Sequence, residues 1–495
     1  MSNVRVRFAP SPTGYLHIGG LRTALYDYLF AKQSGGTYVL RIEDTDRNRF
    51  VDDAMRNLIE SLTWAGVAHD EGVFINAEGE IEQRGDYGPY IQSERLEIYK
   101  EYLDRLIESG HAYPCFCSKE RLESVREAQR ASNEMIKYDG HCRDLSKEEA
   151  AARIAAGEEY VVRLRMPENT DIAFDDTIRG HVSINSDDVD DQVLMKSDGF
   201  PTYHLAAVVD DHLMEISHVV RGEEWLPSTP KHIYLNQCFG WQAPQYVHLP
   251  TVLNKEKKKL SKRHGDVAVG DFRKKGYTKE GLINYLALVG WSPEGDQEIF
   301  SMDELIQAFH FERVSKAGGV FDVDKLNWVN AQHIRKMSVA ELTDLCAPYL
   351  IEAGKIDESV LREQRSWLER LVSTVQERIE VLSDVVEKSG LYFREEVIPE
   401  TEEVAEMLRG ESIPVLIAAM KEDLATVEEI TDETMKGFFK RIQKATGLKG
   451  KNLFMPSRAM ITGQLHGPDM VAVFVVMGKA GIIKRLDYVA EHFTK

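Results

Sequence analysis

Hydrophobic and polar side chains near the N-terminus follow a pattern that predicts a strand, a turn and a helix. Residues 4–8 read Val-Arg-Val-Arg-Phe, which has the two-residue period of a strand. Prolines and a glycine in residues 10–14 then enforce a turn. Residues 16–33 carry apolar side chains at helical spacing. The helix is therefore expected to begin close to the His-Ile-Gly-Gly sequence of residues 17–20.

This helix entrance is a candidate phosphate site. His17, Gly19 and Gly20 fall there. Glycines let a ligand approach the backbone, and the unpaired N–H groups of a first helical turn attract phosphate. The alternative is an ordinary turn between a strand and a helix, where glycine is common.

Strand and helix patterns continue to alternate up to about residue 260. They predict strands over 38–42, 160–165, 218–221 and 246–249, helices over 52–66, 97–108 and 227–239, and a strand or short helix over 204–209. Such alternation is typical of a doubly wound, Rossmann-like α/β fold, which binds ligands at the carboxyl ends of its strands. Glu43 follows such a strand. From about residue 265 helical patterns dominate, as in 278–288, 301–311 and 339–353.

Composition indicates a soluble, cytoplasmic, multidomain protein. The chain has 495 residues, of which 43% are hydrophobic and 29% charged. It shows no apolar run long enough for a membrane span and no secretory signal. A net charge of −20 argues against a protein that coats nucleic acid. Any RNA would have to bind local basic patches, and the candidates are residues 255–263 and 436–451.

The basic stretch Lys255–His264 changes the interpretation of the helix entrance. Taken alone, it is a solvated loop or a generic polyanion patch. Taken together, residues 17–20 resemble the HIGH motif and residues 259–263 the KMSKS motif of class I aminoacyl-tRNA synthetases. The chain resembles bacterial glutamyl-tRNA synthetases almost end to end. The segments that carry this closer resemblance are 7–14, 41–46, 92–95, 202–205, 453–456 and 462–468.

This resemblance implies a two-step reaction and a domain order. Glutamate and ATP would form glutamyl-adenylate and pyrophosphate, and the glutamate would then pass to the 3′ end of tRNA(Glu). A Rossmann-like catalytic domain would comprise residues 1–100 and 199–260, and residues 101–198 would be an inserted α+β domain that binds the acceptor end. A stem-contact region would follow over 261–338. All-helical anticodon-binding parts would occupy 339–408 and 409–495.

The resemblance also implies which residues form the site. His17, Gly19, Gly20, Lys259, Ser261, Lys262 and Arg263 would carry the phosphate chemistry, with Glu224 and Trp225 near ATP. Arg7, Ala9, Ser11, Glu43, Tyr203 and Arg221 would bind glutamate. Arginine suits the side-chain carboxylate and Glu43 the ammonium group. Mg²⁺ would accompany ATP. The alternative for Arg7 and Glu43 is a structural ion pair beneath the sheet.

Three of the five cysteines lie close together and resemble the zinc site of some members of this family. Cys115 and Cys117 are followed after 24 residues by Cys142, and three thiolates favour a structural Zn²⁺. Asp144 takes the position of the expected histidine, and Tyr138 and His141 are nearby alternatives for the fourth ligand. Otherwise the three are reduced cysteines without a metal.

The sequence argues against three other functions. A small nucleotidyltransferase needs no helical C-terminal half, and a glutamine-specific synthetase would more typically carry β-barrels there. A non-catalytic tRNA-binding relative would be expected to lack His17, Lys262 or Arg7, which are all present. The residues do not decide whether tRNA(Gln) is charged as well as tRNA(Glu). Relatives suggest a monomer.

Overall fold

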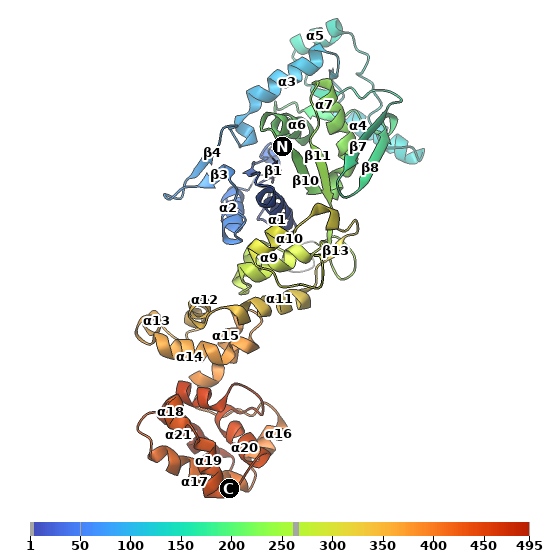
Figure 1. The fold of residues 1–495 in the computed structure, drawn as a ribbon. Helices are drawn as coiled ribbons and strands as arrows, with labels where there is room; N and C mark the ends of the chain where they lie inside the picture. The colour runs from blue at the N-terminus through green and yellow to red at the C-terminus, as the bar shows by residue number, and fades with distance from the viewer. Residues whose placement is uncertain (1–3, 50, 261–266, 495) are drawn as a thin grey trace. The chain divides into compact units, whose positions relative to one another are not determined.

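The strand predicted over residues 4–8 forms β1 (Arg5–Phe8) in the interior of an eight-stranded mixed sheet (Figure 1). The computed structural model describes residues 4–49, 51–260 and 267–494. The sheet runs in the order β4 (Ile81–Arg84), β3 (Glu71–Ile75), β2 (Thr37–Leu40), β1, β10 (His218–Gly222), β11 (Gln245–Leu249), β7 (Asp171–Asp176), β8 (Gly180–Asn185). Pairing is parallel from β3 to β7 and antiparallel at both edges.

Helices cover this sheet because its inner strands are buried on both faces. The covering helices are α1 (Ile18–Gln33), α2 (Ala54–Trp64), α3 (Leu96–Glu108), α6 (Tyr203–Leu213) and α7 (Thr229–Cys238). Residues 204–209, predicted as strand or short helix, therefore belong to a helix. Every residue of β1 is buried, so that Arg5 and Arg7 require partners inside the protein.

The segment expected to be an inserted domain divides its strands between two sheets. β5 (Ala112–Cys115), β6 (Val161–Leu164) and β9 (Val193–Met195) form a small antiparallel sheet, accompanied by α4 (Lys119–Ala131) and α5 (Lys147–Ala155). β7 and β8 of the same segment instead extend the large sheet beyond β11. The sequence did not predict that β7 and β8 join the large sheet.

Two short parallel strands follow the large sheet, β12 (Val252–Leu253) and β13 (Gly319–Val320). Between them lie α8 (Val269–Lys274), α9 (Lys279–Leu288) and α10 (Met302–Ala308). Figure 1 shows α9 and α10 next to α1, which both helices contact. Residues 1–274 and 279–329 form one compact unit, and residues 275–278 and 330–495 form another. α11 (Val323–Lys336) carries the chain from the first unit into the second.

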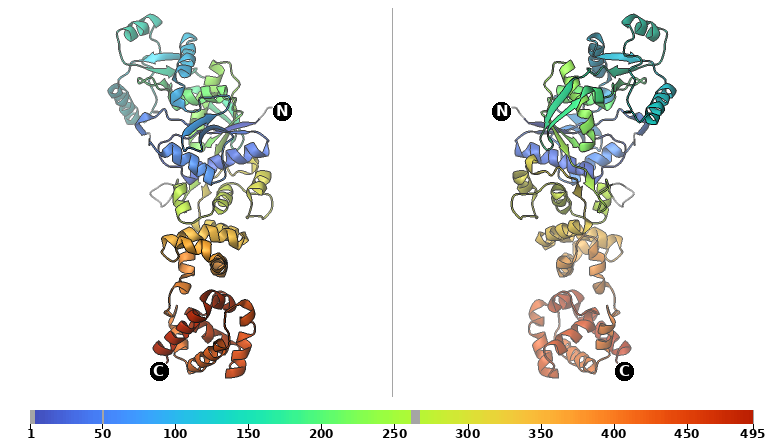
Figure 2. Two further views of the ribbon diagram at one scale, coloured as in Figure 1. Left: turned by 90° about the vertical axis from the view of Figure 1, so that its left-hand side faces the viewer. Right: turned by 90° about the vertical axis from the view of Figure 1, so that its right-hand side faces the viewer.

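The second unit is a bundle of helices (Figure 2). After α11 they are α12 (Val339–Glu352), α13 (Glu358–Glu363), α14 (Arg365–Val375), α15 (Asp384–Lys388), α16 (Glu402–Leu408), α17 (Ser412–Ala425), α18 (Asp432–Met435), α19 (Phe438–Thr446), α20 (Lys451–Thr462) and α21 (Met470–His492). One hydrophobic core gathers side chains between Ile334 and Val385 together with Val476, and another gathers side chains between Leu391 and Val489. The boundaries at 100, 198, 260, 338 and 408 stay predictions. None of the described helices has both the length and the apolarity of a membrane-crossing segment.

Candidate active site

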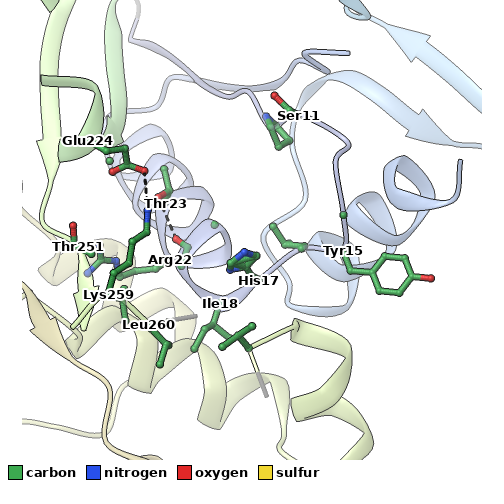
Figure 3. Close-up of a pocket in the computed structure, with 18 of the residues that line it drawn as sticks. Ser11, Tyr15, His17, Ile18, Arg22, Thr23, Glu224, Thr251, Lys259 and Leu260 are labelled. Atoms are coloured by element: carbon green, nitrogen blue, oxygen red, sulfur yellow. Dashed lines mark hydrogen bonds and ion pairs between the residues drawn. The ribbon is translucent and has the colours of Figure 1, made fainter. Parts of the chain in front are cut away.

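The turn after β1 and the entrance of α1 line a cavity of about 510 Å³, which we call the first cavity. His17 is exposed and has an extended backbone immediately before α1. Figure 3 shows it at the helix entrance, with Tyr15 directed away. Around Gly19 the space that a Cβ would enter is open. Among the described residues, the N–H groups of Gly19 and Gly20 have no hydrogen-bond partner. The helix therefore offers backbone donors to a ligand in this cavity.

The start of the basic stretch forms another wall of the first cavity. The Asn254 side chain accepts hydrogen bonds from the backbone N–H groups of Glu256 and Lys258, at 3.0 and 2.9 Å, and so closes a tight turn. Lys259 follows the turn, and its Nζ lies 3.9 Å from Oε1 of Glu224 (Figure 3). The predicted residues Ser261, Lys262 and Arg263 lie outside the described residues.

A second cavity, of about 530 Å³, lies at the carboxyl ends of the sheet strands. All six residues predicted to bind glutamate line it, as does Trp225. Trp225 packs against Tyr203, with ring centroids 4.1 Å apart and ring planes tilted by 37°. The two cavities share Phe8, Ser11, Thr23 and Gly222. A ligand in one cavity is therefore in reach of a ligand in the other.

Arg7 and Glu43 do not pair with each other, contrary to the structural alternative considered for them. Arg7 donates to both carboxylate oxygens of Asp211, at 2.9 and 3.3 Å. Glu43 accepts from Arg41 at 3.0 Å, and Arg41 also reaches Asp211 at 2.8 Å. Sequence reasoning missed Arg41 and Asp211. The available signal was a charged residue inside each of two apolar segments, 38–42 and 205–211.

The buried acids of this network differ in their affinity for protons. Burial raises the pKa of Glu43 above its ordinary value, although Arg41 and Arg7 act against the increase. Burial acts in the same direction on Asp211. There, however, Arg7 and Arg41 hold the pKa below its ordinary value. Asp211 therefore stays ionised and balances the buried arginines. The ionised form of Glu43 is less favoured, and an additional cation beside it would stabilise that form.

Arg221, at the end of β10, differs from these arginines because its partners are neutral. It is buried and donates to Tyr203, Thr229, His232 and His248. No carboxylate of the described residues lies within ion-pair distance of it. Its positive charge remains available to an anionic ligand in the second cavity.

The three clustered cysteines come together at the end of β5. Their sulfur atoms lie within 4.8 Å of one another. The hydroxyl of Tyr138 lies 3.4 Å from the Cys115 sulfur and 3.5 Å from the Cys117 sulfur. Asp144 is not part of this group. Its carboxylate is exposed and lies 3.6 Å from Arg165. His141 is also exposed and outside the group.

Comparisons with known proteins agree with this geometry. Residues 3–328 match the family model of class I tRNA synthetases (E and Q), catalytic domain, and residues 341–490 match that of an anticodon binding domain. A glutamate–tRNA ligase of Clostridioides difficile (strain 630) is 57% identical over 98% of this chain and 99% of its own length. One of Alkaliphilus metalliredigens (strain QYMF) is 56% identical over 99% of this chain and 100% of its own.

The fold is also similar to that of solved glutamate tRNA ligase structures. The crystal structure of a glutamate tRNA ligase from Elizabethkingia meningosepticum CCUG26117, in complex with its amino acid, superposes with a TM-score of 0.88. It is 35% identical over 99% of this chain and 100% of its own. Family models, relatives and fold thus agree over both units. The chain belongs to the glutamate–tRNA ligases, which are ATP-using class I aminoacyl-tRNA synthetases.

Proposed function

We propose that the first cavity holds ATP and the second holds glutamate, so that the two substrates meet at their shared wall. The glutamate α-carboxylate would attack the α-phosphate there, beside Ser11, Thr23 and Gly222. This nucleophile is already anionic, so no general base is needed. The protein supplies alignment and positive charge for the phosphate that forms in the transition state.

In the second cavity, Arg221 would bind the side-chain carboxylate of glutamate. The single observation that carries this assignment is its burial without a carboxylate partner among the described residues. Arg7 adds a second positive charge, which Asp211 already balances in part. Glu43 would receive the ammonium group, and Ala9, Ser11 and Tyr203 complete the wall. Glutamine would leave Arg221 without its anion, which should cost several kcal/mol.

In the first cavity, His17 and the backbone of Gly19 and Gly20 would contact the ATP phosphates. Glu224 lines this cavity and would lie near the adenosine, whereas Trp225, also predicted near ATP, lines the second cavity. Lys259 would support the basic loop, in which Ser261, Lys262 and Arg263 would stabilise the leaving pyrophosphate. Mg²⁺ would neutralise charge on the phosphates, and phosphate oxygens and water supply most of the ligands it prefers.

We also propose a structural Zn²⁺ held by Cys115, Cys117 and Cys142. Their sulfur atoms are close enough to share one ion. Tyr138 is better situated than Asp144 to supply the fourth ligand. Its oxygen lies beside two of the sulfurs and accepts the Cys142 N–H at 2.8 Å. The Asp144 carboxylate is instead exposed, next to Arg165.

For the tRNA anticodon we propose a polar surface in the helical unit, with one monomer binding one tRNA. Buried atoms Nη1 of Arg378 and Oε1 of Gln464 lack hydrogen-bond partners among the described residues and lie at a cavity of about 120 Å³. A Cβ built on Gly467 would lie 3.4 Å from Nη1 of Arg458 and 3.7 Å from Nη1 of Arg378. An unpaired donor on Arg378 and an unpaired acceptor on Gln464 at one cavity suit the edges of unstacked bases. Charging assays with both tRNAs decide whether tRNA(Gln) is accepted.

Glutamate-dependent exchange of pyrophosphate into ATP tests the main proposal. We expect exchange when cognate tRNA is present, and a loss of exchange in the Arg221→Met variant. Exchange without tRNA would show that adenylate formation does not require it. A folded wild-type protein that exchanges no pyrophosphate with tRNA and Mg²⁺ supplied would falsify the proposal.

A further inference from the structure

Arg221 is surrounded by acceptors that carry no charge. Its Nε donates to Nε2 of His248 at 3.1 Å, and its Nη2 donates to the Thr229 hydroxyl at 2.9 Å. Its Nη1 donates to the Tyr203 hydroxyl and to Nδ1 of His232, both at 3.0 Å. A guanidinium has five N–H donors. One hydrogen on Nη2 therefore remains without a partner among the described residues.

The proton positions on His248 follow from its neighbours. Nδ1 lies 2.7 Å from Oδ2 of Asp176, an oxygen that also accepts the His248 backbone N–H at 3.0 Å. The other carboxylate oxygen of Asp176 accepts the N–H groups of Ile178 and Arg179. Because an ionised carboxylate only accepts, the proton must lie on Nδ1. Nε2 then has the lone pair that receives Arg221.

The same reasoning fixes His232 and His204. Nδ1 of His232 receives an Arg221 hydrogen, so its proton lies on Nε2. That Nε2 lies 3.0 Å from Nδ1 of His204, which must therefore accept. A second proton on either ring would direct an N–H at a donor. Burial, with the nearby positive charge, lowers the pKa of His232 well below its ordinary value and that of His204 to about 3.

We infer that His232 and His248 are positioning residues that determine specificity for glutamate. Each orients the Arg221 guanidinium as a neutral acceptor in one fixed tautomer, and neither cancels its charge. The inference rests on the proposed binding of the substrate carboxylate by Arg221. The contrast is Arg7, whose positive charge is partly balanced by Asp211 at 2.9 Å. A carboxylate in the position of either ring would convert Arg221 into such an internal ion pair.

Two isosteric variants of His232 test this inference. Asn Oδ1 and Asp Oδ1 both stand two bonds from Cβ, as His Nδ1 does, so both accept from Arg221. They have nearly the same shape but differ in charge, and the Asn Nδ2 donates where the second Asp oxygen accepts. We expect His232→Asn to keep the preference for glutamate over glutamine. We expect His232→Asp to lower kcat/KM for glutamate by about 10- to 100-fold, with little change for glutamine. The assay compares L-glutamate with L-glutamine in tRNA(Glu) aminoacylation.

The results for these variants separate the role of His232 and His248 from the role of Arg221. Equal preferences in His232→Asn and His232→Asp would overturn the inference, because a packing defect affects both alike. If His232→Asp does not fold, His248→Gln and His248→Glu repeat the comparison at Nε2. His69→Leu is the control, since His69 is buried against Phe74 away from both cavities. An Arg221→Met variant that still prefers glutamate would refute the proposed function. A preference lost there but equal in the isosteric pair refutes only the inference.

Discussion

Gly19 offers a test of the phosphate site in which stability and activity should change in opposite directions. Gly19→Ala adds a methyl group in the first turn of α1, where nothing lies within 4 Å. Ala in a helix is favoured over Gly, so the free energy of unfolding should rise by up to about 1 kcal/mol. In the proposed complex the same methyl meets a phosphate. Overpacking costs about 1–3 kcal/mol, so kcat/KM for ATP should fall roughly 5- to 150-fold.

Gly270 provides a matched control for this substitution. It is also the second residue of a helix, α8, and also has nothing within 4 Å of its Cβ position. It does not line either substrate cavity. Gly270→Ala should therefore leave ATP kinetics unchanged. Pyrophosphate exchange at varied ATP, with urea unfolding of both variants, makes the comparison. Unchanged ATP kinetics in folded Gly19→Ala would refute the approach of phosphate to this turn.

Other predictions concern the supports of the site. Asp211→Asn should lower the free energy of unfolding at neutral pH by about 3–5 kcal/mol, because two buried arginines lose their carboxylate. Since the pKa of Asp211 is held low, the stability it adds is present above about pH 4 and is lost below it. Urea unfolding from about pH 7 to about pH 3 should show this acid-side loss in wild type but not in the variant. Cys142→Ser should abolish bound zinc, and Tyr138→Phe should weaken it, as measured by metal analysis of chelator-free protein. Arg22→Lys should lower stability by about 1–3 kcal/mol in urea unfolding, because a single nitrogen replaces the separate Nη1 and Nη2 groups that donate to the Val289 and Pro250 carbonyls.

The sequence predicted the site better than it predicted the network behind the site. The two-residue period of residues 4–8 and the Pro-Gly turn predicted β1 and α1. The rule that ligands bind at carboxyl ends of strands predicted that Arg7, Glu43 and Arg221 share a crevice, and all three line the second cavity. Asp211 was missed because it lies on α6, just before β10, and its contact with Arg7 of β1 depends on the order of the strands in the sheet. β1 pairs with β10, about two hundred residues further on, and no local pattern reveals that pairing.

Other differences between the predictions from sequence and the structure also have physical reasons. The short apolar run at 204–209 fits a buried strand or a buried helix equally well, and contacts with α7 and α3 favour the helix. The resemblance to zinc-binding family members nominated Asp144 as the fourth zinc ligand, whereas folding leaves it exposed next to Arg165 and brings the alternative, Tyr138, to the sulfurs. In both cases the chain was compatible with two local arrangements, and a contact distant in sequence selected one.

Buried arginines of the first unit differ in the charge of their partners, and Arg7 and Arg221 show that both kinds line the second cavity. Arg5 and Arg95 pair with Glu71 and Asp210 at 3.0 and 2.7 Å, so each charge is cancelled where it is buried. Arg221 lines the second cavity and Arg22 the first, and their partners among the described residues are hydroxyls, imidazoles and carbonyls. Neutral dipoles replace the water that a buried cation loses without cancelling its field. Arg221 and Arg22 therefore keep their attraction for an anion, and burial strengthens it by lowering the effective dielectric constant around the charge.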